Sequence, residues 1–98
     1  MARIRTHPGE ILREEFMKPL GLSANALALE LHVPATRIGE IIREDKPRSV
    51  TADTAIRLGR YFGTTAEFWV NLQTAHNLSV AQAGHGARID RDVHPRST

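Results

Sequence analysis

The 98-residue sequence contains no cysteine. This absence excludes disulfide scaffolds, thiolate metal sites and thiol nucleophiles, so packing alone has to hold the fold together. The sequence also has no apolar run that approaches the length of roughly 20 residues needed to span a bilayer. No apolar run follows Arg3 and Arg5, so the N-terminus does not have the pattern of a secretory signal. Since 41% of the residues are hydrophobic, we expect one compact cytoplasmic domain without a membrane segment.

The sequence is also poor in net charge. Its 13 Lys and Arg residues against 11 Asp and Glu residues give a formal charge of +2, too small an excess to identify a nucleic-acid binder. The balance is more basic between residues 43 and 60, where the charged residues are Arg43, Lys46, Arg48, Arg57 and Arg60 against Glu44, Asp45 and Asp53. This segment predicts either a local positive zone or a solvated surface of mixed charge.

No alternating pattern is long enough to predict a strand, whereas helix start and stop signals recur along the chain. We therefore predict an all-α fold of five helices. The first helix is expected to start at Pro8 and to stop at Pro19. The other four are expected to start at the Ser23 cap, after Pro34, at the Thr51 cap and at Thr65, and the one that starts at Thr51 ends at Gly63. The residues after Gly84 are polar and contain glycine and proline, so we expect a disordered or adaptable end there.

The stretch "LSANALALELHVPATRIGEIIRED", Leu22 to Asp45, has the pattern of a helix-turn-helix unit. Ala28 is the small residue where the two helices cross, Val33 is an apolar plug in the turn, and Ile38 and Ile41 point inward. His32 occupies a turn position that usually requires a positive φ, which histidine adopts only at some cost. The alternative is an ordinary helical hairpin with a wet outer face.

In DNA-reading units of this type the start of the second helix enters the major groove. The outward residues there, which we predict to read bases, are Ala35, Thr36, Arg37 and Glu40. An arginine can pair with guanine, a glutamate can accept from cytosine, and methyl groups can contact thymine. Candidates for phosphate contacts are Ser23, Asn25, Arg43, Lys46, Arg48 and Ser49.

Four blocks of the chain resemble one known family, the HigA-type antitoxins among the Xre and phage-repressor-like proteins. The blocks are "HPGEILREEFMKPLGLS", "VPATRIGEIIRED", "TADTAIRLGRYFGTTAEFWVNLQ" and "AHNL", and the resemblance covers Pro8 to about Gln82. It implies a five-helix, lambda-repressor-like DNA-binding domain that forms a homodimer and binds a palindromic operator on double-stranded DNA. It also implies a HigB-type toxin partner, an endonuclease that cuts messenger RNA on the ribosome.

Catalytic and metal-binding patterns are weak. The five histidines are His7, His32, His76, His85 and His94. They show neither the spacing of metal ligands nor an HExxH pattern. The adjacent carboxylates Glu14 and Glu15 point in different directions on a helix, and Ser23 and Ser49 lack a His-Asp setting. We therefore predict neither an enzyme nor a cofactor or metal site.

Phe68 and Trp69 are adjacent, so both cannot point into one small core. One of them is expected to face another subunit, and the predicted dimer residues are Trp69, Val70, Gln73 and Leu78. The alternative is that Trp69 closes the core of its own domain. The predicted organisation is a DNA-binding and dimerisation domain over residues 1–83 and a polar C-terminal tail over residues 84–98.

Three functions remain open at this stage. The first is an antitoxin that also represses its own operon. The second is a stand-alone Xre-type repressor without a toxin partner, and the third is a protein-only inhibitor whose helix-turn-helix is vestigial. For the toxin contact we favour the acidic side of the first helix, with Glu10, Glu14 and Glu15, over the mixed-charge tail.

Overall fold

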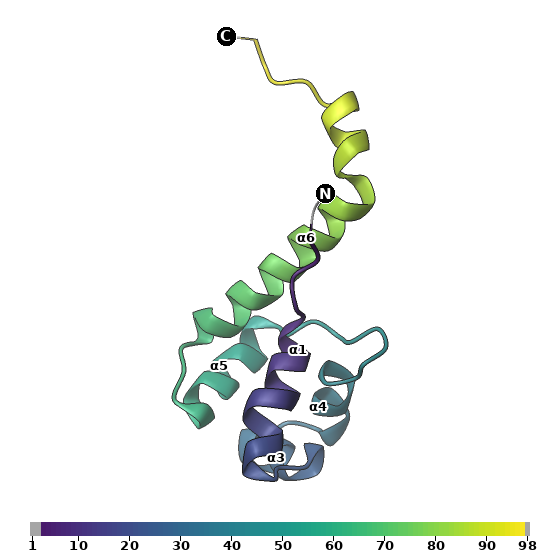
Figure 1. The fold of residues 1–98 in the computed structure, drawn as a ribbon. Coiled ribbons are helices and arrows are strands. Elements are labelled where there is room, and N and C mark those ends of the chain that lie inside the picture. The colour runs from purple at the N-terminus through teal and green to yellow at the C-terminus, as the bar shows by residue number, and fades with distance from the viewer. Residues whose placement is uncertain (1–2, 98) are drawn as a thin grey trace.

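The computed structural model describes residues 3–97 as an all-helical fold (Figure 1). The first helical rod joins α1 (Pro8–Ile11), the π-helical segment η1 (Leu12–Met17) and α2 (Lys18–Leu20). Four helices follow: α3 (Ala24–Leu31), α4 (Ala35–Ile41), α5 (Ala52–Phe62) and α6 (Ala66–Asp92). The prediction of an all-α fold with five helices is confirmed, and no helix in this range is long and apolar enough to cross a membrane.

The first rod begins at a histidine cap and passes very close to α4. The Nδ1 atom of His7 accepts a hydrogen bond of 2.8 Å from the backbone N–H of Gly9, and Pro8 occupies the first helical turn. A side chain at Gly9 would overlap the carbonyl oxygen of Ile41, at the end of α4. Glycine is therefore what allows the two backbones to approach, while the fully buried Leu12 fills the core beside them.

The α3–α4 pair has the predicted turn geometry. The Ser23 hydroxyl accepts a 3.1 Å hydrogen bond from Ala26 N–H at the start of α3. The helix ends at His32 with φ of 58°, which confirms the positive φ expected there. The backbone N–H of Val33 then donates to the carbonyl of Ala28 at 3.0 Å, so a left-handed turn joins the two helices.

The core lies where these helices meet α5 and the first half of α6. The side chains of Ile38 and Ile41 on α4 are 0% and 1% exposed. Those of Ala55 and Leu58 on α5 are fully buried, and so is Trp69 on α6. Ile38 and Ile41, which the sequence predicts to point inward, therefore lie in one core with residues of α5 and α6.

The prediction of a disordered end after Gly84 is wrong as far as Asp92, because α6 continues without a break from Ala66 to Asp92. Gly84 and Gly86 lower helix propensity by only about 1 kcal/mol each, which weakens a helix without ending it. The first proline after them is Pro95, so no residue before Asp92 removes a helical hydrogen bond. The far part of α6 projects beyond the body of the domain (Figure 1), and its residues are almost all exposed.

The N-terminal segment before α1 lies against α6. The backbone N–H of Arg5 donates to the Ser79 hydroxyl at 2.8 Å, and the carbonyl of Arg5 lies 2.7 Å from Nδ1 of His76. His7 is only 8% exposed, and its ring meets that of His76 edge to face at 4.9 Å. Burial, together with the nearby His76, lowers the pKa of His7 from 6.5 to about 4.

The contact at Gly9 gives a direct test of the packing. The substitution Gly9→Ala is expected to lower the free energy of unfolding by about 3 kcal/mol, since the new methyl group cannot fit against a backbone carbonyl. Gly39→Ala is the matched control, because a Cβ at Gly39 has no atom within 4 Å and alanine favours the helix. Denaturant unfolding measures both, and equal stability of the two variants would contradict the close approach.

The buried His7 predicts a pH-dependent stability. Between pH 4 and 6.5 the unfolded chain binds a proton at this ring that the folded chain does not. The free energy of unfolding should therefore be highest above pH 6.5 and fall by about 2 kcal/mol as the pH drops to about 4.5. The variant His7→Asn keeps a capping side chain that does not titrate, so its stability should depend less on pH. Equal pH profiles for the two proteins would refute this assignment.

Candidate nucleic-acid interface

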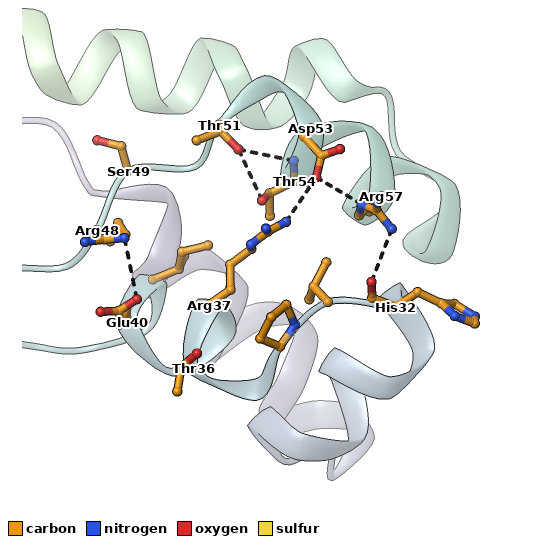
Figure 2. A pocket seen from close by; sticks show the side chains of 13 residues that line it. His32, Thr36, Arg37, Glu40, Arg48, Ser49, Thr51, Asp53, Thr54 and Arg57 are labelled. Atoms are coloured by element: carbon orange, nitrogen blue, oxygen red, sulfur yellow. Dashed lines mark hydrogen bonds and ion pairs between the residues drawn. The ribbon is translucent and has the colours of Figure 1, made fainter.

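The outward side of α4 borders an open hollow of about 560 Å³ (Figure 2). Thr36, Arg37 and Glu40 line it from α4, together with Arg48 and Ser49 from the following loop. The start of α5 closes the other side with Thr51, Asp53, Thr54 and Arg57. The structure thus brings together three of the four predicted base-reading residues and two of the predicted phosphate contacts.

Ala35 differs from the other predicted base readers in packing against the hydrophobic core. It is half-buried and packs against the core at the first position of α4. Thr36 is exposed, whereas Arg37 and Glu40 are half-buried. The hydrophobic core therefore already covers part of Ala35, and Thr36 and Arg37 have more surface available for a ligand.

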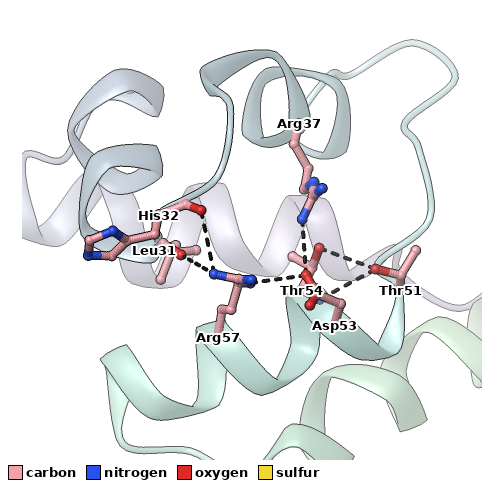
Figure 3. Close-up of polar contacts among 7 residues, drawn as sticks. All are labelled: Leu31, His32, Arg37, Thr51, Asp53, Thr54 and Arg57. Atoms are coloured by element: carbon pink, nitrogen blue, oxygen red, sulfur yellow. Dashed lines mark hydrogen bonds and ion pairs between the residues drawn. The ribbon is translucent and has the colours of Figure 1, made fainter.

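A chain of polar contacts ties Arg37 to the neighbouring helices (Figure 3). Nη1 of Arg37 donates to Oδ2 of Asp53 at 3.0 Å, and Nε of Arg57 donates to the same oxygen at 3.0 Å. Nη1 of Arg57 also donates to the carbonyl of Leu31 at 2.9 Å, at the end of α3. The hydrogen bond from Arg57, with the positive charges of Arg57 and Arg37, holds the pKa of Asp53 below its usual range.

Glu40 holds the loop that follows α4. Its carboxylate lies 3.7 Å from Nη1 of Arg48, and its backbone carbonyl accepts a 2.9 Å hydrogen bond from the N–H of Arg48. Both contacts fold the loop back onto α4 (Figure 2). Arg48 and Ser49 therefore lie beside the predicted base-reading residues rather than away from them.

The other predicted phosphate contacts are more scattered. The Ser23 hydroxyl caps α3, and Asn25 is exposed in the first turn of that helix. Lys46 is exposed with φ of 51°, an uncommon conformation for a side chain of this size. Arg43 lies on another surface, where it lines a hollow with Glu10 and Glu44. The structure does not bring these four residues into the hollow beside α4.

The residue assignments made from the sequence missed Asp53 and Arg57 as parts of this site. Besides their place in the charged segment 43–60, their sequence signal is the i, i+4 spacing on one helix, which predicts an ion pair on α5. That spacing carries no information about α3 or α4. The contact of Asp53 with Arg37, 16 residues earlier in the chain, exists only because the helices pack together.

The assignment of Gln73 and Trp69 to a dimer interface is wrong. The carboxamide oxygen of Gln73 accepts a buried 2.7 Å hydrogen bond from Val50 N–H, and its nitrogen donates to Asn77. Trp69 is 0% exposed, and its Nε1 donates to the Thr64 hydroxyl at 2.8 Å. Both side chains are buried in their own domain, so another chain cannot contact them without opening the core.

The remaining dimer candidates have more accessible surface. Val70 is half-buried and Leu78 is 57% exposed. Of the adjacent aromatic pair, Phe68 is the one that reaches solvent, at 38% exposure. No group of three or more metal-ligating side chains that could hold an ion occurs among residues 3–97.

Residues 14–69 match the family model described as Helix-turn-helix, which covers more than half of the chain. The chain is 62% identical over 76 residues to virulence-associated protein I of Dichelobacter nodosus, an alignment that covers 78% of this chain and 68% of that protein. Across four curated relatives, the chain spans 63% to 71% of their length.

Two solved structures extend the similarity to nearly the whole chain. Antitoxin HigA of Pseudomonas aeruginosa, solved with the higBA promoter, is 46% identical with a TM-score of 0.88, over 94% of this chain and 98% of that one. Antitoxin GraA, solved in complex with its operator, is 45% identical with a TM-score of 0.91, over 100% of this chain and 97% of that one.

Proposed function

Since this chain belongs to the HigA-type, Xre-like helix-turn-helix family, we propose that it is an antitoxin and a DNA-binding autorepressor. One observation carries the proposal more than any other. The hollow beside α4 presents Thr36, Arg37 and Arg48 to solvent in a chain 46% identical to an antitoxin solved with its promoter. An arginine in this position can reach base edges or phosphates.

The DNA partner in this proposal is a palindromic operator bound by a homodimer. Two copies related by a two-fold axis place their α4 helices in successive major grooves, about 34 Å apart. The side chains that read bases are those of Thr36, Arg37 and Glu40. Ala35 is half-buried and contributes a smaller contact. Lys46, Arg48 and Ser49 hold phosphates, with Ser23, Asn25 and Arg43 as outer candidates. Val70 and Leu78 on α6 belong to the surface that joins the two copies.

The protein partner in this proposal is a HigB-type toxin that cuts messenger RNA. We place its contact on the first helical rod, because a strongly basic nuclease is attracted to carboxylates. Hydrogen bonds from Lys18 and then Arg13 lower the pKa of Glu14, and both side chains lie 2.8 Å from its carboxylate. The negative charge of Glu14 is therefore already compensated by two cations, and the exposed Glu10 and Glu15 are the stronger candidates.

Replacing Arg37 tests base reading. The substitution Arg37→Ala is expected to cost about 1 to 3 kcal/mol in binding to the operator and much less on random DNA, because only a base contact depends on sequence. Lys46→Ala and Arg48→Ala should weaken both DNAs alike and reduce the dependence on salt concentration. Binding titrations at several salt concentrations measure these affinities, with one duplex that carries the operator located by footprinting and one scrambled duplex. Equal losses on both duplexes for Arg37→Ala would reassign it to a phosphate.

Co-expression tests the antitoxin role. We expect a small neighbouring gene whose product arrests growth when expressed alone, and this chain should restore growth and co-purify with that product. A neighbouring product that is harmless alone, or that this chain neither rescues nor binds, would leave a stand-alone repressor. A chain that rescues growth but does not bind its operator would instead be a protein-only inhibitor.

A further inference from the structure

We propose that Asp53 is a positioning residue that makes DNA binding by this chain more selective, acting through Arg37. This inference rests on the proposed function, because it concerns how the same surface distinguishes its operator from other DNA. In the free chain Asp53 holds the arginine that is best suited to read a base. The carboxylate thereby strengthens binding to the operator and weakens binding to random DNA.

The position of Asp53 is set from two sides. It lies in the first turn of α5, and Arg57 one turn later donates to its Oδ2 at 3.0 Å. Arg57 is itself fixed at the end of α3 by the carbonyls of Leu31 and His32, at 2.9 and 3.4 Å. The carboxylate is therefore held between α3 and α5 independently of Arg37, which reaches it from α4 (Figure 3).

This anchoring orders Arg37 in advance. Within residues 3–97 its guanidinium makes a single side-chain hydrogen bond, the one to Asp53. An arginine has five N–H donors in a rigid fork, so one edge can stay on Asp53 while another faces a guanine. An arginine whose guanidinium is already held in place loses less conformational freedom when it pairs with a base. On the operator, Asp53 is therefore expected to strengthen the contact of Arg37.

The effect on random DNA has the opposite sign. Without a matching base, Arg37 can contribute only its positive charge to phosphate binding, and the adjacent carboxylate offsets that charge. Asp53 is 58% exposed at its side chain and lines the same hollow as Thr36 and Arg48, so it also repels nearby phosphates. Loss of the carboxylate should consequently strengthen non-specific binding.

The substitution Asp53→Asn tests this, since it removes the charge and keeps the shape. The matched control is Glu67→Gln, which removes an exposed first-turn carboxylate at the same helical position of α6. The probes are a duplex carrying the footprinted upstream operator and a scrambled duplex of equal length. For Asp53→Asn, affinity for the scrambled duplex should rise about threefold, and the operator preference should fall about fivefold or more. Glu67→Gln should change neither by more than about twofold.

The same measurement in an Arg37→Ala background shows whether Asp53 acts through Arg37. There the substitution Asp53→Asn is expected to leave the operator preference unchanged, and circular dichroism confirms that each variant is folded. The proposal is overturned if Asp53→Asn leaves the preference intact, strengthens both duplexes equally, or lowers the preference as much without Arg37. A wild-type chain with no preference for its operator would instead refute the proposed function itself.

Discussion

Burial of Ile38 and Ile41 is the constraint on which the rest of the interface depends. The helix α4 has only seven residues, too few to be stable by itself, and Pro34 before it offers no side-chain cap. Packing of these two isoleucines into the core, at 0% and 1% exposure, fixes the rotation of α4 about its own axis. That rotation decides that Thr36 faces outward and that Arg37 reaches the start of α5.

Side chains from outside the helix-turn-helix satisfy the backbone groups that its short helices leave unpaired. Arg57 on α5 donates to the carbonyl of Leu31, and Arg13 on η1 donates to that of Ile42. Outside the unit, Gln73 on α6 accepts in the same way from the N–H of Val50, in the segment just before α5. A buried polar group without a partner costs about 1 to 3 kcal/mol, so these contacts stabilise the unit as well as orient it. The interface is therefore a property of the whole domain.

The polar network also gives the interface a balanced charge. Arg37 and Arg57 share Asp53, and Arg48 approaches Glu40, so the basic residues counted between positions 43 and 60 are partly compensated. Both alternatives drawn from the charge count hold in part, because the surface carries mixed charge, yet Arg48 and Arg57 from this segment line one hollow together with Arg37. Such an arrangement favours a ligand that offers specific acceptors over one that offers only negative charge.

Local chemistry was sufficient to predict most helix boundaries from the sequence. Caps at Ser23, Thr51 and Thr65, and left-handed ends at His32 and Gly63, depend on a few neighbouring residues, and the structure has all of them. The end of α6 was misplaced because glycine weakens a helix without stopping it. The helix-turn-helix pattern predicted four base-reading residues at the start of α4, and the structure places three of those four along one hollow.

Tertiary packing alone decided which of these side chains are already engaged. The spacing on α6 could not show that Trp69 and Gln73 face the core, because residues on several sides of a helix can be buried when other segments cover them. Nor could it show that Asp53 holds Arg37, since these residues lie 16 positions apart in the chain and on two different helices. The sequence by itself determined the helices and the chemistry they carry. The packing angles between helices determined which groups meet, because a hydrogen bond forms only at distances near 3 Å.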